Sequence, residues 1–188
     1  MKSLTSGMIL YHGSYCVVEK PDLARCSKYK DFGQGFYLTS SKRQAMSFAK
    51  ISASKAKSDD LISPDTEFAY ISCFKLSDIL DLSIYSYDTA DIDWLHCIVA
   101  HRRKRAFVNI RKQMEAYDII AGKIANDDTN TTINAYMSHV FGKMGSSVAD
   151  RMCISLLIPE RLQDQFCFRS DKSLTKLSFW DSENVALG

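Results

Sequence analysis

Two short blocks hold the residues best suited to chemistry, YHGS at positions 11–14 and DFGQGFYLTS at positions 31–40. In the first block, Gly13 follows His12 at the expected end of a strand. One imidazole and an unobstructed backbone can therefore face a ligand together. A lone histidine on a strand is more often a structural side chain, so a functional interpretation of His12 depends on what accompanies it.

The second block has two glycines, Gly33 and Gly35, just ahead of an expected strand. A dinucleotide-binding fingerprint would need a third glycine at position 38, which is Leu38, and it would open a helix after a strand. The DFG triplet lacks the other motifs of a protein kinase. Taken alone, this block predicts a tight turn.

Two aromatic residues give the second block a further meaning. Phe48 follows Tyr37 by eleven residues and lies about three turns into an expected helix, so its ring can fold back toward Tyr37. Two rings facing one gap would suit a flat cationic ring such as nicotinamide. The alternative is that Phe48 is a core residue, as an aromatic at helical spacing usually is.

Metal and disulfide chemistry is not expected. The six cysteines form no CxxC pair and no cluster with histidine at zinc spacing. His96 and His101 are five residues apart, which places them on different sides of a helix, and no HExxH occurs. We expect reduced thiols, mostly in the core, and no metal site.

Composition bounds the class of protein. The 188 residues have a formal net charge of +2, with 46% hydrophobic and 24% charged residues, so we expect one globular domain over residues 1–188. No apolar run is long enough for a membrane helix, and the first ten residues do not resemble a secretory signal, so a cytoplasmic location is expected. The near-neutral charge argues against broad capture of nucleic acid. The basic run HRRKR at 101–105 predicts a solvated helix end, with contact to an acidic partner or nucleic acid as the alternative.

The elements that must position these residues alternate irregularly. Hydrophobic patterns predict strands at 8–13, 36–39, 66–76, 81–87 and 117–124. Helices are expected after an N-cap at Ser40 or Ser41, near 92–99, at 133–144 after a turn at 126–132, and at 148–157. A terminal pair of strands is expected at 165–169 and 174–180. Strands at both ends with helices between them favour the α+β class.

The blocks together resemble the ADP-ribosyltransferase superfamily, in the branch of diphtheria toxin and the poly(ADP-ribose) polymerase catalytic domains. YHGS (11–14), GQGFYLTSSKRQAMSFA (33–49) and DQFCFR (164–169) carry the resemblance. The chain is most similar to small bacterial PARP-like domains, which also have PDL and YDxxxGxxA segments, as found here. The resemblance implies an α+β fold with a split antiparallel β-sheet core and inserted helices.

The resemblance also implies roles for single residues. His12 would hydrogen-bond an NAD ribose hydroxyl, the Gly13 backbone would pair with the nicotinamide carboxamide, and Tyr37 would stack on nicotinamide with Phe48 as the second ring. Arg25, together with Lys28, is expected near the pyrophosphate, although a surface role is equally open. The full set of implied NAD-binding residues is Tyr11, His12, Gly13, Ser14, Arg25, Gly35, Tyr37, Phe48 and Asp127, and the implied catalytic residues are His12, Tyr37 and Gln165.

Gln165 is the departure from the family pattern, because it stands where the classical members have a catalytic glutamate. An amide can orient the ribose 2′-hydroxyl, but it brings no negative charge and cannot remove a proton from an acceptor. Polymer elongation is therefore not expected, and Asp164, Glu160 or Asp127 are candidates for a replacement carboxylate. From the sequence, Gln165→Glu is expected to keep the fold and to favour NAD cleavage.

The implied function is an NAD-dependent mono-ADP-ribosyltransferase with NAD as substrate and a protein or nucleic acid as acceptor. The resemblance also implies a toxin that an antitoxin protein holds in check. The alternatives are an NAD glycohydrolase, an RNA 2′-phosphotransferase on the same fold, and an inactive domain that only binds NAD or ADP-ribose.

Overall fold

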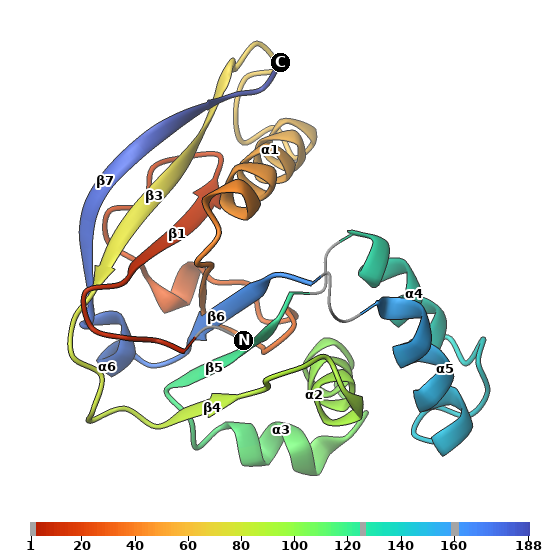
Figure 1. Ribbon diagram of the computed structural model, residues 1–188. Helices are drawn as coiled ribbons and strands as arrows, with labels where there is room; N and C mark the ends of the chain where they lie inside the picture. The colour runs from red at the N-terminus through yellow and green to blue at the C-terminus, as the bar shows by residue number, and fades with distance from the viewer. Residues whose placement is uncertain (1–2, 125–126, 159–161) are drawn as a thin grey trace.

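The computed structural model describes residues 3–124, 127–158 and 162–188 and has two β-sheets with helices on their outer faces (Figure 1). The first sheet has the order β1-β3-β7, and the second has the order β2-β6-β5-β4. The α+β class is therefore confirmed. The strands are β1 (Ile9–Ser14), β2 (Phe36–Leu38), β3 (Phe68–Leu76), β4 (Ile84–Ser86), β5 (Ile119–Lys123), β6 (Asp164–Phe168) and β7 (Leu177–Ala186).

One helix covers the first sheet and the others surround the second. Helix α1 (Lys42–Ser58) begins after Ser41, whose hydroxyl accepts a hydrogen bond from the Gln44 N–H, as predicted for an N-cap. Its buried face consists of alanines, so the helix lies close to β1 and β3. The remaining helical elements are η1 (Leu23–Arg25), α2 (Ile92–Arg102), α3 (Val108–Met114), α4 (Asp127–Met137), α5 (Ser147–Leu157) and α6 (Asp171–Leu174).

The two sheets meet at strands β1 and β2. Tyr11 and Thr39 form an isolated antiparallel bridge, with N···O distances of 2.9 and 3.0 Å between their backbones. Below this bridge, apolar side chains from both sheets share one core, which includes Leu10 and Phe74 from the first sheet and Phe36 and Phe166 from the second. The bridge and this core place β1 beside β2, where the two predicted blocks lie.

The expected turn at 126–132 is wrong, because α4 begins at Asp127. Asn, Asp and Thr favour turns when they are considered locally. In the fold, Thr129, Ile133 and Tyr136 recur at helical spacing and are buried, and α4 packs against α5, so tertiary packing overrides the local preference. The helix expected to continue to 144 ends at Met137, and His139 has a left-handed φ of 62°.

The expected terminal strand pair is also wrong. Strand β6 pairs with β2 and β5, whereas β7 lies in the other sheet beside β3. Helix α6 separates the two strands, and its capping box between Ser170 and Ser173 redirects the chain. The core is not wholly antiparallel either, because β4 and β5 are parallel, and helix α3 was not predicted.

Two further expectations concern the cysteines and helices that could cross a membrane. All six cysteines are free, and Cys73, Cys97, Cys153 and Cys167 are buried, as predicted. Over the described residues, no helix is both long and apolar enough to cross a membrane.

Candidate functional site

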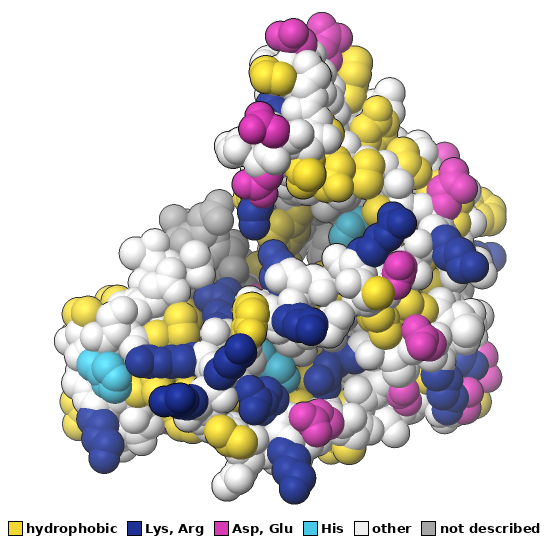
Figure 2. Space-filling model, turned by 180° about the vertical axis from the view of Figure 1, so that it is seen from behind, with side chains coloured by type: hydrophobic (Ala, Val, Ile, Leu, Met, Phe, Trp, Pro, Cys, Tyr) yellow, Lys and Arg dark blue, Asp and Glu magenta, His cyan; other side chains and the backbone are white. Residues whose placement is uncertain are grey.

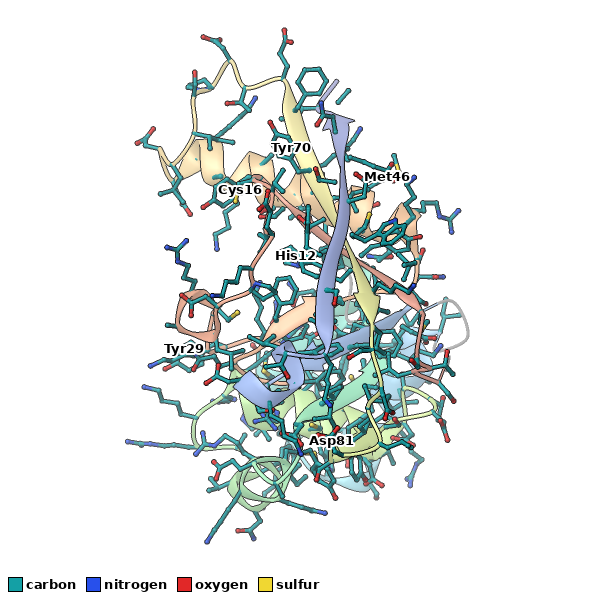
Figure 3. The ribbon with its side chains drawn as sticks, turned by 90° about the vertical axis from the view of Figure 1, so that its left-hand side faces the viewer. His12, Cys16, Tyr29, Met46, Tyr70 and Asp81 are labelled. Carbon is teal, nitrogen blue, oxygen red and sulfur yellow. The ribbon has the colours of Figure 1, made fainter. Side chains whose placement is uncertain are left out.

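His12 lies at the junction of the two sheets (Figure 3). Its Nδ1 is 2.8 Å from the Tyr37 carbonyl oxygen, and its ring lies against Phe36 at a centroid distance of 4.4 Å. Since a carbonyl can only accept, Nδ1 carries the hydrogen and Nε2 is left as an acceptor. Burial lowers the pKa of His12, although the hydrogen bond to Tyr37 opposes this effect. The imidazole is therefore neutral at pH 7, and its Nε2 can accept a hydrogen bond from a hydroxyl group.

Gly13 has a packing role and a backbone role. A Cβ at Gly13 would lie 2.0 Å from the Ala45 carbonyl oxygen, so only glycine permits the observed approach of α1. Within β1, the Tyr11 N–H and C=O bond to Thr39 rather than to β3. Backbone groups alternate along a strand, so those of Gly13 face the same edge as those of Tyr11. On the other side of Gly13 along this edge, the Tyr15 N–H donates to the Ser52 hydroxyl at 3.2 Å.

Tyr37 is anchored by its hydroxyl group. The hydroxyl donates to the Gly33 carbonyl at 2.8 Å and accepts from the Phe32 N–H at 2.9 Å. Burial, with smaller contributions from Cys167 and Asp31, raises the pKa of Tyr37 well above its usual value, so the hydroxyl stays protonated. The predicted tight turn is thus held closed by the tyrosine that follows it.

Gln165 lies in a buried polar network that the sequence did not indicate. Its amide nitrogen is 2.9 Å from Asp31 Oδ2 and 3.1 Å from the Lys123 carbonyl oxygen. Both partners are acceptors, so the amide N–H groups face them and the amide oxygen is turned away. Asp31 is held in turn by Arg102, whose Nε is 3.0 Å from Asp31 Oδ1, and Arg102 also donates to Asn130 at 2.7 Å. Gln165 is only 5% exposed, so the orientation of its amide is fixed by the fold.

Asp164, a candidate replacement carboxylate, is already in an ion pair. Its Oδ1 lies 2.8 Å from Lys123 Nζ across the β5–β6 ladder, and its backbone carbonyl accepts from the Thr39 hydroxyl at 2.9 Å. The other two candidates fall outside what the structure describes: Asp127 begins α4 but its side chain is not described, and Glu160 lies outside the described residues.

The remaining predicted residues differ in position and role, and several of them serve packing. Tyr11 packs into the cluster beneath α1, on the face opposite to His12, and Ser14 is buried beside Cys16. Gly35 is buried, and a Cβ there would lie 2.4 Å from Cys167 Sγ, so it serves packing against β6. Phe48 is partly buried on α1, and the ring contacts among described residues do not pair it with Tyr37.

Arg25 lies at the end of η1 and is exposed, with its Nε 3.6 Å from the neighbouring Asp22 carboxylate. Lys28 is exposed as well. Gln34 holds η1 to the glycine turn by donating to the Leu23 carbonyl at 2.7 Å. A hollow of about 400 Å³ lies between η1, residues 115–118 and Arg169, and none of the predicted site residues is among those that line it.

His101, expected in a solvated helix end at 101–105, is instead buried. Its Nδ1 lies 2.9 Å from the Cys97 carbonyl, and its Nε2 has no hydrogen-bond partner among the described residues. The ring lies against Gly33, where a Cβ would come within 2.7 Å of it. As predicted, His96 lies on another side of α2, 3.0 Å from Asp150. No group of three or more His, Cys, Asp or Glu in the described part of the chain is arranged to hold a metal ion.

Comparison with known proteins gives a family but no characterised relative. No curated protein matches the chain, and no solved structure matches it. One family model, described as a protein of unknown function (DUF3990), matches residues 8–179, which include strands β1 to β6, the first residues of β7 and the residues of the junction. The chain therefore belongs to the DUF3990 family.

Proposed function

We propose that this chain is an NAD-dependent mono-ADP-ribosyltransferase, which cleaves the nicotinamide–ribose bond and transfers ADP-ribose to a macromolecular acceptor. The observation that carries the proposal is the open edge of β1 at Gly13. Its N–H and C=O face the same side as those of Tyr11, and the hydrogen bonds between described residues outside the ladders include neither group. One free donor and one free acceptor on a strand edge suit a carboxamide, which offers the complementary pair.

The arrangement around this edge supports the same substrate. His12 is adjacent to Gly13 on β1, its ring is fixed by Tyr37 on β2, and Gln165 follows on β6, the next strand of the second sheet. Two sheets joined at the Tyr11–Thr39 bridge support the split-sheet core that the family resemblance implies. A neutral His12 with Nε2 as acceptor suits a ribose hydroxyl.

In the proposed reaction, the bond between the nicotinamide nitrogen and ribose C1′ breaks, and nicotinamide leaves with the electron pair. The acceptor then forms a bond to C1′ and loses its proton. Gln165, whose amide oxygen is turned away from Asp31, can accept a hydrogen bond from the ribose 2′-hydroxyl. It cannot take the acceptor's proton, so the acceptor must be nucleophilic or lose its proton to water. This supports single transfer rather than polymer elongation.

A domain that binds NAD without transferring ADP-ribose is the second candidate. The observation that favours it is the pairing of the nearby carboxylates: Asp31 is held by Arg102, and Asp164 by Lys123. Such pairing reduces the negative charge available to a positively charged ribose. Hydrolysis of NAD, with water as the acceptor, is a further outcome of the same site. A toxin that a partner protein restrains remains the biological setting that the family resemblance suggests.

Incubation of the protein with labelled NAD in a cell lysate separates these functions. Label on a macromolecule supports transfer, and nuclease or protease treatment identifies the acceptor. Free ADP-ribose supports hydrolysis, and a raised melting temperature with neither product supports binding alone. His12→Ala should abolish the signal, with His139→Asn as the control, because His139 is exposed after the end of α4 and asparagine tolerates its left-handed φ. No shift in melting temperature at NAD concentrations above millimolar would refute the proposal.

A further inference from the structure

Exposed lysines and arginines gather where residues 103–107, which connect α2 to α3, meet residues 28–30, which precede the turn at Gly33. Figure 2 shows many Lys and Arg side chains on the lower part of this face, while acidic side chains lie at its upper end and along its right-hand side. No Asp or Glu occurs between residues 94 and 114. We call the following exposed residues the basic surface: Lys28, Lys30, Arg103, Lys104, Arg105 and Lys112.

The charge of the basic surface is not neutralised by the acidic side chains that the structure describes. None of its six residues takes part in an ion pair within 4.0 Å with another described residue. The nearby carboxylate of Asp31 is bound to Arg102 instead. Because the whole chain has a net charge of only +2, these cations are a local concentration and not part of a general excess.

An exposed aromatic ring lies among these cations. Tyr29, between Lys28 and Lys30, is 53% exposed, and the Lys104 ammonium from the other segment lies 5.6 Å from its ring centroid. Figure 3 shows Tyr29 at the edge of the molecule, with nitrogen-tipped side chains extending from the same edge. Cations interleaved with an accessible ring are typical of surfaces that bind unpaired bases, which stack on the ring while phosphates contact the cations.

We propose that the basic surface binds single-stranded nucleic acid, with phosphates on its lysines and arginines and a base on Tyr29. An acidic protein could use the cations but has no need of the ring, and a duplex has no unstacked base to offer it. Arg102, next to Arg103 in the chain, connects this surface to Asp31 and hence to Gln165. The binding itself does not depend on the proposed transfer reaction.

Fluorescence anisotropy with a labelled 20-nucleotide single-stranded RNA tests the proposal. If about four phosphates are contacted, the Kd should rise roughly fifty-fold between 50 and 200 mM salt. Lys104→Glu with Arg105→Glu should weaken binding by at least about tenfold. The matched control is Lys50→Glu with Lys55→Glu, which makes the same change of charge at exposed positions on α1. Equal affinities for the two double variants would overturn the proposal.

Tyr29 gives a second, independent readout. Tyr29→Ala should raise the Kd about tenfold, while Tyr29→Phe should bind like the unchanged protein because the ring is kept. Failure to bind the RNA at 50 mM salt would overturn the proposal. Tighter binding of poly-glutamate than of RNA would overturn it in favour of an acidic protein partner. These results would leave NAD binding at the junction of the sheets unaffected, so the two proposals fail separately.

Discussion

The contact with Asp31 explains why the fold accommodates an amide side chain at position 165. The Gln165 N–H groups satisfy two acceptors, the Asp31 carboxylate and the Lys123 carbonyl, in a buried position. A glutamate at this position would face both acceptors with a charge of its own. The sequence alone predicts that Gln165→Glu keeps the fold and favours NAD cleavage, but it does not show that Asp31 lies beside Gln165.

We now predict that Gln165→Glu destabilises the protein by about 3 kcal/mol, because a buried carboxylate would lie against the Asp31 carboxylate. Adding Asp31→Asn should recover at least about half of this loss, since an amide is then restored between the two positions. Urea unfolding measures both free energies. A single Gln165→Glu variant as stable as the unchanged protein would show that the amide is not held as described.

At the scale of elements, the approach of α1 to β1 depends on the absence of a side chain at Gly13. The nearest atoms to a Cβ there belong to the backbone of Ala45 and Ala49, which cannot move without the helix. At Gly122 on β5, the nearest atoms belong to side chains, with Phe32 Cζ at 2.8 Å.

Gly13→Ala should therefore cost more stability than Gly122→Ala, by about 1–3 kcal/mol, because overpacking against a backbone cannot be relieved by rotamer changes. Chemical denaturation of the two variants gives the comparison, and both positions are strand residues, so intrinsic strand propensity cancels. Equal losses would mean that α1 shifts readily and that its close approach to β1 is not rigid.

The elements themselves were predictable where the local pattern agreed with the packing. The strand at β1, the Ser41 cap and the α1 helix follow from alternation and helical spacing. The helix over residues 127–132 was not predictable, because its Asp, Asn and Thr residues favour a turn locally and become helical only when Ile133 and Tyr136 are buried beside α5. Which sheet β7 would join was likewise undetermined, since its partner β3 lies about a hundred residues earlier in the chain.

For the whole molecule, the partly buried His12 and the buried His101 make stability depend on pH. Burial lowers the pKa of both His12 and His101 from 6.5, and for each a backbone hydrogen bond opposes part of the effect. Below pH 6.5 the unfolded chain binds protons that the folded chain does not, so this stability is fully present above that pH. It is lost as pH falls toward the folded pKa values.

The free energy of unfolding should therefore fall by about 1–2 kcal/mol between pH 7.5 and 5.5, within the limit of about 1.4 kcal/mol per pH unit for each histidine. His101→Gln should reduce this fall, because it removes one of the two groups whose pKa is lowered. Asp81 and Asp118, whose pKa values are lowered, lose their contribution only at more acidic pH. Stability that is constant over the interval would contradict the lowered pKa values of the two rings.

The sequence by itself determined the α+β class, the two blocks at 11–14 and 31–40 and the free cysteines. It also indicated His12, Gly13 and Tyr37 as candidate site residues. All of these depend on residue types and short spacings. Only the tertiary structure decided which strands neighbour one another and what each side chain contacts. Asp31 meets Gln165 across 134 residues, and Arg102 meets Asp31 across 71 residues. Such contacts leave no local periodicity in the chain, since they form only when both sheets and α2 enclose the same polar groups.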